Sequence, residues 1–241
     1  MFRRRSTPPP GPLSALVVGL GNPGREYGTT RHNVGYRVVD LLAEKWGVRL
    51  GRSRFQGRLG LGEVGGRRVA LLHPTTFMNR SGEAVAAAAR FYRIPPERIL
   101  VVADDVNLEL GRLRVRRAGS AGGHHGLESV IGMLGASDFP RVRVGVGTPE
   151  AAIDRVAYVL GRFRPEEIAP LTLALRRAAE AVEVWLTEGV EAAANRFNAP
   201  LAQEQDEQRR PHRQPVDDEG VEGAGAQPAQ EKGDGHHPAQ G

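Results

Sequence analysis

The sequence contains no cysteine among its 241 residues, and only 5% of its residues are aromatic. The lack of cysteine excludes disulfide bonds, thiolate nucleophiles and thiolate metal sites, and it fits a reducing compartment. No apolar run approaches the about 20 residues that span a bilayer, and the short run 13–20 is typical of a strand rather than a signal peptide. We therefore expect a cytoplasmic protein without membrane association.

The composition limits the number of domains. Hydrophobic residues make up 40% of the chain, which is enough for one substantial core but leaves little room for a second. We predict a single domain over residues 13–198, between a disordered Arg- and Pro-rich extension at 1–12 and a disordered acidic tail at 199–241. The tail pair His236 and His237 is a weak metal-ligand set, so we expect no metal there.

The charge is divided unevenly along the chain. From Leu201 onward there are nine acidic residues and four arginines or lysines, so the tail carries a formal −5 while the whole chain carries +5. The remainder therefore carries +10, which suggests a polyanionic partner such as a nucleic acid. A solvated basic surface accounts for the charge alone equally well.

Hydrophobic periodicity predicts alternating strands and helices. A pair of glycines, Gly65 and Gly66, predicts a hairpin turn between two of the strands. This alternation predicts one α/β domain with a mixed sheet and helices on both faces. The predicted strands are 16–18, 55–64, 67–72, 99–102, 113–117 and 141–146, and the predicted helices are 30–46, 82–92, 127–134 and 165–195.

The first glycine-rich segment, GLGNPG at 19–24, has the glycine spacing of a dinucleotide-binding loop. In such a loop the helix begins at the turn, and an acidic residue ends the following strand. Here Asn22-Pro23-Gly24 forms a turn, the helix begins only near Thr30, and the candidate acid Asp40 lies within that helix. The context excludes this interpretation, and we expect no cofactor.

His32 lies in the first turn of a predicted helix, where exposed backbone N–H groups disfavour the imidazolium form. A neutral imidazole can accept a proton as a general base, although a lone histidine is more often structural. Possible partners follow two strands: Asn79 lies on the loop 74–82, and Asp104 ends the strand 99–102. A carboxylate can orient the histidine, and an amide can donate to a carbonyl oxygen. No residue stands out as a covalent nucleophile, so the attacking group would be water.

The segment 112–126 carries arginines on a predicted strand and then a glycine-rich loop. Backbone N–H groups and arginines in this arrangement are suited to phosphate. The adjacent His124 and His125 rarely both reach one ion, so we expect no metal site.

Taken together, these segments resemble the bacterial peptidyl-tRNA hydrolase family. The resemblance covers nearly all of 16–198 and rests on six stretches in the family's order. They are GLGNPGREYGTTRHNVG, PTTFMNRSG, ADDVNLELG, GSAGGHHGL and RVRVGVG, the last followed by YVLGRF. The resemblance implies a monomeric esterase without metal or cofactor that releases peptide from the 3′ end of peptidyl-tRNA, without an obligate protein partner.

The resemblance also implies roles for individual residues. It identifies His32 as the general base, Asp104 as its supporting carboxylate, and Asn22 as the residue that distinguishes a peptidyl amide from a free amino group. The other implied contacts bind substrate: Tyr27, Asn33, Phe77, Met78, Asn79 and His125 near the ester and 3′ nucleotide, and Arg116 and Arg143 at phosphate.

Two positions depart from the family pattern. His125 stands where asparagine is usual, and an imidazole cannot donate and accept through one planar amide. Asn107 stands where an acid is common. The alternative to an esterase is an RNA-binding protein without catalysis, which His125 favours. Such a protein would not need Asn22, His32, Asn79 and Asp104 together.

Overall fold

The computed structural model describes residues 12–149 and 152–199. The segments predicted to be disordered, 1–12 and 199–241, lie almost entirely outside the described residues. Seven strands form one sheet in the order β2-β3-β4-β1-β5-β7-β6. Its strands are β1 (Ala15–Gly19), β2 (Arg52–Arg54), β3 (Gly57–Val64), β4 (Arg67–Pro74), β5 (Ile99–Asp105), β6 (Leu113–Arg116) and β7 (Arg141–Gly145).

The middle of the sheet is parallel and its edges are antiparallel. Strand β1 pairs in parallel with β4 and β5, and β5 pairs in parallel with β7. Strands β2 and β3 on one side and β6 on the other are antiparallel. The carboxyl ends of the four parallel strands therefore meet at one edge, where open α/β sheets bind their ligands. The prediction of a mixed sheet is confirmed.

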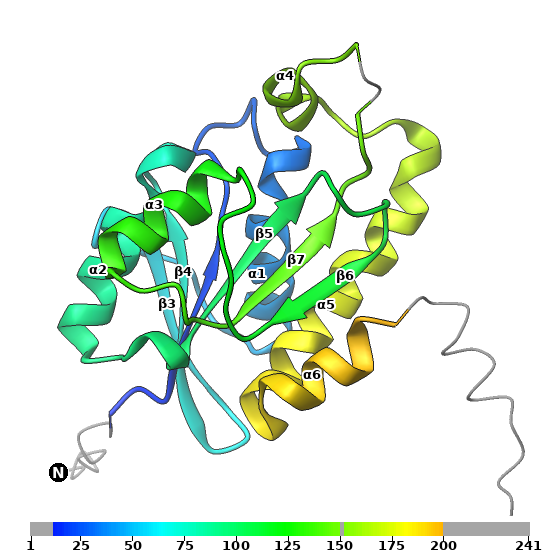
Figure 1. Ribbon diagram of the computed structural model, residues 1–241. Coiled ribbons are helices and arrows are strands. Elements are labelled where there is room, and N and C mark those ends of the chain that lie inside the picture. The colour runs from blue at the N-terminus through cyan, green and yellow to red at the C-terminus, as the bar shows by residue number, and fades with distance from the viewer. Residues whose placement is uncertain (1–11, 150–151, 200–241) are drawn as a thin grey trace, which may run out of the picture.

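Helices cover both faces of the sheet (Figure 1). Helices α1, α5 and α6 pack on one face, and α2 and α3 pack on the other. Both faces of the sheet are apolar, as strand β1 shows. Val17 points to the core under α1, α5 and α6, whereas Leu16 and Val18 point to the core under α2 and α3. The helices are α1 (Val34–Lys45), α2 (Ser81–Tyr92), α3 (His125–Leu134), α4 (Arg155–Leu160), α5 (Ile168–Glu188) and α6 (Val190–Phe197), with short 3₁₀ turns η1 (Arg31–Asn33), η2 (Met78–Arg80), η3 (Pro96–Arg98) and η4 (Pro165–Glu167).

Three elements differ from the sequence prediction. The single helix expected over 165–195 is wrong, because Gly189 adopts a φ of 98° and separates α5 from α6. The short strand β2 and the helix α4 were not predicted. Helix α4 has only six residues, so it is too short for its apolar residues to show a helical period in the sequence.

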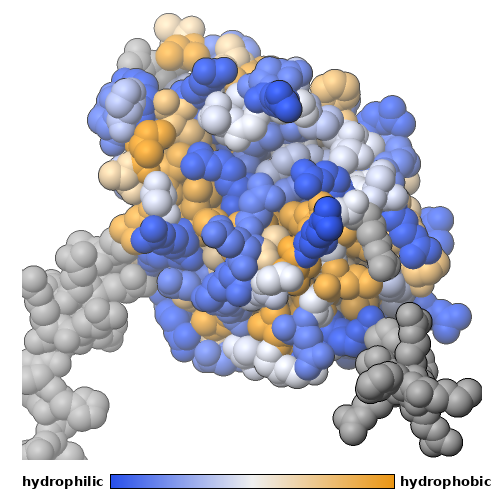
Figure 2. All heavy atoms as spheres, turned by 180° about the vertical axis from the view of Figure 1, so that it is seen from behind, coloured by the Kyte–Doolittle hydropathy of each residue, from blue (hydrophilic) through white to orange (hydrophobic). Residues whose placement is uncertain are grey.

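The surface mixes hydrophilic and apolar residues. On the rear face, hydrophilic side chains are spread between smaller apolar patches (Figure 2). Among the described residues, no helix combines the length and apolar character that crossing a membrane requires.

Candidate active site

A contact between main-chain atoms brings His32 to the end of β5. A Cβ on Gly35 would lie 2.5 Å from the backbone of Leu20 and 2.5 Å from the carbonyl oxygen of Val102. Only glycine permits so close an approach, so α1 begins directly against the ends of β1 and β5. As a result, η1 places His32 beside Asp104, although the two are 72 positions apart in the chain.

His32 and Asp104 form a buried pair. The Nδ1 atom of His32 lies 2.9 Å from Oδ1 and 3.0 Å from Oδ2 of Asp104. The side chain of His32 is 11% exposed, and that of Asp104 is 2% exposed. An ionised carboxylate only accepts, so Nδ1 of His32 carries the proton and donates it. In the neutral ring, Nε2 then keeps its lone pair, and no described residue forms a hydrogen bond with it.

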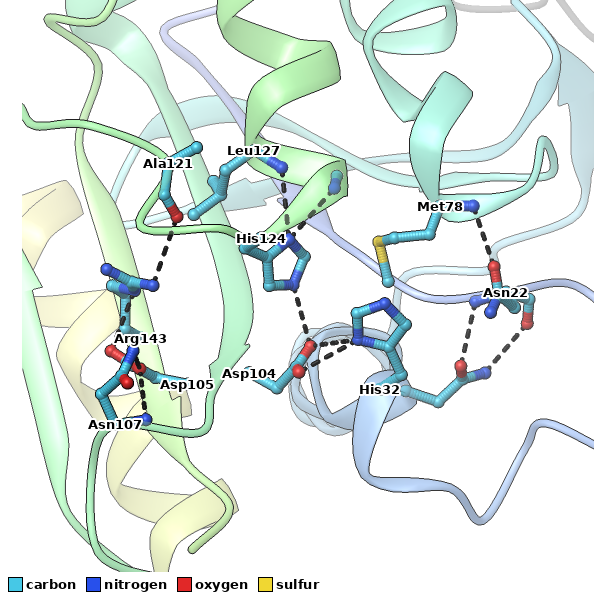
Figure 3. A network of polar contacts seen from close by, with 12 residues as sticks. Asn22, His32, Met78, Asp104, Asp105, Asn107, Ala121, His124, Leu127 and Arg143 are labelled. Carbon is cyan, nitrogen blue, oxygen red and sulfur yellow. Dashed lines mark hydrogen bonds and ion pairs between the residues drawn. The ribbon is translucent and has the colours of Figure 1, made fainter. Parts of the chain in front are cut away.

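A second histidine holds the same carboxylate. The Nε2 atom of His124 lies 2.9 Å from Oδ1 of Asp104, and the three side chains converge (Figure 3). His124 also caps α3, because its Nδ1 accepts hydrogen bonds from the backbone N–H groups of Gly126 and Leu127, at 3.1 and 3.3 Å. An Nδ1 that accepts carries no proton, so Nε2 of His124 is protonated and donates to Asp104.

This tautomer bears on metal binding. His32, Asp104 and His124 offer atoms within 4.8 Å of one another, a spacing compatible with one ion. A ligating imidazole needs a lone pair on the coordinating nitrogen. Nε2 of His124 could provide one only if Nδ1 took the proton, which would then face the N–H groups of Gly126 and Leu127. The cluster is therefore suited to ordering a carboxylate rather than to holding a metal.

The two imidazoles also decide the charge of Asp104. Complete burial alone raises the pKa of this carboxyl. Its interactions with His124 and His32 outweigh burial and hold the pKa of Asp104 well below its ordinary value. Asp104 therefore remains an anion throughout the physiological pH range, and it can stabilise positive charge on His32.

Asn22 is oriented by its neighbours. Its Oδ1 accepts a hydrogen bond from the backbone N–H of Met78 at 2.8 Å. Its backbone exchanges two hydrogen bonds of 2.9 Å with the side chain of Asn33. The bond from Met78 assigns the amide oxygen, so the Nδ2 group of Asn22 is left to donate. Asn33 thus lies behind Asn22 as its support.

These groups line a cleft of about 720 Å³ at the carboxyl edge of the sheet. The cleft brings together most of the residues that the sequence singled out. They are Asn22, His32, Phe77, Met78, Asn79, Asp104, His125 and Arg143. Tyr27, Asn33 and Arg116 do not line it; Tyr27 is half-buried on the loop before η1, and Arg116 is exposed on the edge strand β6.

Arg143 is more buried than a phosphate-binding arginine on an open surface would be. Its Nε is 3.0 Å from Oδ2 of Asp105, and its side chain is 14% exposed. A Cβ on Gly122 would lie 3.0 Å from its guanidinium, so this glycine lets the loop pack directly on the arginine. Arg143 therefore anchors the glycine-rich loop and also presents positive charge to the cleft.

Sequence reasoning missed two parts of the cleft. His124 appeared only as a doubtful metal ligand, because the helix was predicted over 127–134, whereas α3 begins at His125 and makes His124 its N-cap. The other part is the wall formed by Arg155, Val156, Val159 and Leu160 of α4. The stretch YVLGRF, which begins within this short helix, matched the family pattern, but no role in a cleft was predicted for it.

A histidine–carboxylate pair in a cleft at the carboxyl edge of a parallel sheet defines an α/β enzyme equipped for base catalysis. The comparisons with known proteins are more specific. The family model for peptidyl-tRNA hydrolase matches residues 16–208. The chain therefore belongs to the peptidyl-tRNA hydrolase family. It is an enzyme, which excludes the alternative of an RNA-binding protein without catalysis.

Individual relatives agree with this assignment. The chain is 53% identical over 199 residues to a peptidyl-tRNA hydrolase of Synechococcus sp. (strain JA-3-3Ab), an alignment that covers 82% of this chain and 88% of the relative. It is 51% identical to that of Caldanaerobacter subterraneus subsp. tengcongensis, covering 76% of this chain and 98% of the relative. The crystal structure of peptidyl-tRNA hydrolase from Acinetobacter baumannii is similar with a TM-score of 0.74 and 37% identity, covering 79% of this chain and 98% of that one.

Proposed function

We propose that His32, supported by Asp104, is the general base with which the chain hydrolyses the ester of peptidyl-tRNA, releasing tRNA and peptide for reuse in translation. One observation carries this proposal: Nδ1 of His32 is committed to Asp104 at 2.9 Å, which leaves Nε2 as the proton acceptor beside the cleft. Asp104 would stabilise the imidazolium that forms during turnover.

The reaction needs only water besides the substrate. Nε2 of His32 takes a proton as the water oxygen attacks the ester carbonyl between peptide and ribose. The carbonyl oxygen becomes an oxyanion, and the ribose oxygen then leaves with the proton from His32. The products are a peptide carboxylic acid and a free ribose hydroxyl, and His32 returns to its neutral form.

Two amides are suited to the carbonyl groups of the substrate. Asn79 is exposed on the cleft and would donate to the ester carbonyl as negative charge builds on it. The Nδ2 group of Asn22, left free by the bond from Met78, would donate to the peptidyl amide and so select N-blocked substrates over free aminoacyl-tRNA. This assignment rests on the orientation of Asn22 and on the resemblance of its position.

The remaining substrate contacts follow from position and chemistry. Phe77 is 58% exposed on the rim and would contact the 3′ terminal nucleotide, next to Met78 and His125. Tyr27 and Asn33 do not line the cleft, so they would support the substrate-binding residues indirectly. Arg116 and Arg143 would bind phosphate, because guanidinium groups form paired hydrogen bonds with phosphate oxygens.

The decisive experiment compares labelled N-blocked aminoacyl-tRNA with free aminoacyl-tRNA in the wild type, His32→Ala and Asn22→Ala. We expect His32→Ala to lose about 10²- to 10⁴-fold in kcat. Asn22→Ala should narrow the preference for the blocked substrate. Near-normal release of label by His32→Ala would refute the assignment of the base.

We further propose that the enzyme acts in the cytoplasm as a monomer, without cofactor, metal or obligate protein partner. Ribosomes produce its substrate in that compartment, and all the proposed catalytic groups come from one chain. Sedimentation at micromolar concentration tests whether the enzyme is a monomer. An activity assay with and without a chelator tests whether it needs a metal.

A further inference from the structure

Helix α4 forms one wall of the cleft, and Tyr158 is its contact with the core, where the hydroxyl donates to the carbonyl oxygen of Val146 at 3.0 Å. It contributes Arg155, Val156, Val159 and Leu160 to the cleft, and none of its residues is buried. The side of α4 that faces the body of the protein therefore needs a specific anchor. The element against which α4 packs most is η1, the turn that carries His32.

Arg31, the residue before His32, is that anchor. Its guanidinium carbon lies 4.4 Å from the ring centre of Tyr158 in α4 and 4.8 Å from that of Phe163. Its backbone N–H donates to the carbonyl of Gly161, at the end of α4, with a distance of 3.0 Å. Arg31 thus contacts α4 through both its main chain and its side chain, in addition to the hydrogen bond from Tyr158 to Val146.

The side chain of Arg31 also fixes the segment after α4. It donates to the carbonyl oxygen of Arg162 and to Oε2 of Glu167, the latter at 2.7 Å. Arg31 and Glu167 are almost wholly buried, with side chains 6% and 10% exposed. Glu167 in turn accepts from the backbone N–H of Arg164, which joins the start of η4 to the same point.

A buried ion pair of this kind contributes little net stability, because removing both charges from water offsets most of their attraction. The ion pair instead fixes the position of η4 relative to η1. A guanidinium presents a planar fork that can stack between two rings and still donate at its edge, which the point charge of lysine cannot reproduce. The contacts of Arg31 fit a role in geometry better than a role in stability.

We infer that Arg31 is a positioning residue, which holds the α4 wall at a fixed place relative to His32 so that the cleft is formed before substrate arrives. Arg31 touches no reacting atom. Losing its contacts would let α4 move away, and the substrate would bind less tightly while His32 and Asp104 kept their geometry. The kinetic part of this inference rests on the proposed function, whereas the position of α4 does not.

Arg31→Lys and Arg31→Met test the inference, with Arg177→Lys as a matched control. Arg177 is also a buried arginine near an aromatic ring, that of Phe197, but it lies on α5 away from the cleft. Phe163→Leu, which removes one stacking ring only, serves if Arg31→Met fails to fold. Two readouts apply: KM and kcat on N-blocked aminoacyl-tRNA, and hydrogen exchange of the amides of α4 and α1.

We expect Arg31→Lys to raise KM about tenfold and change kcat less than about threefold, because binding is lost without loss of the base. Amides of α4 should exchange about tenfold faster, and those of α1 at the wild-type rate. Arg177→Lys should lower the melting temperature without either change. Unaltered exchange in α4, or an equal rise of KM in Arg177→Lys, would overturn the inference. If His32→Ala proved active, the exchange measurement would still decide the role of Arg31.

Discussion

Asp104 receives from His124 a hydrogen bond that can run in only one direction. His124 accepts at Nδ1 from two backbone N–H groups of α3 and must therefore donate at Nε2, 2.9 Å from Oδ1 of Asp104. The first turn of α3 thus fixes the tautomer of a side chain that fixes the carboxylate. The carboxylate then fixes the tautomer of His32.

Replacing His124 should separate its capping of α3 from its hydrogen bond to Asp104. In His124→Asn the helix keeps a favourable capping residue, but the shorter side chain no longer reaches Asp104. We expect kcat to fall about 10- to 100-fold, since a hydrogen bond to a charged group contributes roughly 1.5–3 kcal/mol. Urea unfolding should show a loss of about 1–3 kcal/mol, because the buried carboxylate of Asp104 loses one of its donors. A full kcat in a well-folded His124→Asn would show that Asp104 needs no second donor.

Replacing Asp104 by asparagine should have a larger effect than replacing His124. The amide can turn its N–H groups toward Nδ1 of His32 and so favour the tautomer that has its proton on Nε2. A base with the wrong tautomer loses about 10⁴-fold in kcat in a comparable triad. Single-turnover release of labelled peptide measures the loss. If Asp104→Asn retained more than about a tenth of the activity, the orienting role of the carboxylate would be wrong.

The buried His73 should make stability depend on pH. Its ring stacks on Tyr36 at 4.2 Å, and its Nε2 lies 3.1 Å from the carbonyl oxygen of Tyr36. Burial lowers the pKa of His73 to about 4 from an ordinary value of 6.5, more than the hydrogen bond to the backbone of Tyr36 raises it, and nearby Arg58 lowers it further. Between these values the unfolded chain binds a proton that the folded chain does not.

The difference in bound protons decides whether the free energy of unfolding rises or falls with pH. Above pH 6.5 His73 contributes no pH dependence, and as pH falls from 6.5 toward 4 the free energy of unfolding decreases. The full loss is on the order of 3 kcal/mol. Urea unfolding at pH 7 and 4.5 measures it, and His73→Gln, which can still donate to Tyr36, should reduce the difference. An equal pH dependence in that variant would assign the effect to other groups.

Much of this arrangement could be predicted from the sequence, because it depends on local patterns. Buried strands, the hairpin at Gly65 and Gly66, and the helix start near His32 all have signatures within a few residues of their position. The cooperation of His124 with Asp104 has no such signature, since it depends on how α3 approaches the end of β5. The α4 wall was missed for a similar reason: its contacts come from Arg31, far away in the chain.

Gly35→Ala should be strongly destabilising. The added Cβ would lie 2.5 Å from backbone atoms of Leu20 and Val102, which cannot move as a side chain can. We expect a loss of at least about 1–3 kcal/mol in the free energy of unfolding. Gly132→Ala in α3 is a matched control with no atom within 4 Å of the new Cβ, and it should stabilise by roughly 0.5–1 kcal/mol. Equal stability of the two variants would contradict the close contact of α1 with the sheet.

Arg116→Ala should weaken RNA binding without destabilising the fold, because Arg116 is exposed on β6. Removing one phosphate contact should lower the slope of log affinity against log salt by about 1. Arg54→Ala removes the same charge at the opposite edge of the sheet and should leave that slope unchanged. Titrations of tRNA at several salt concentrations measure both. A similar effect of the two variants would mean that only net charge matters.

Asp104 and Asp105 are consecutive in β5, yet one serves the imidazoles and the other serves Arg143. Consecutive side chains of a strand point to opposite faces, so a single residue inserted upstream in β5 would move Asp104 into the place of Asp105 and put Ala103 beside the imidazoles. The register of β5 therefore sets the positions of both carboxylates at once. Such an insertion would take the carboxylate away from the imidazoles while leaving one beside Arg143, and a compensating deletion within the same strand would restore both pairings.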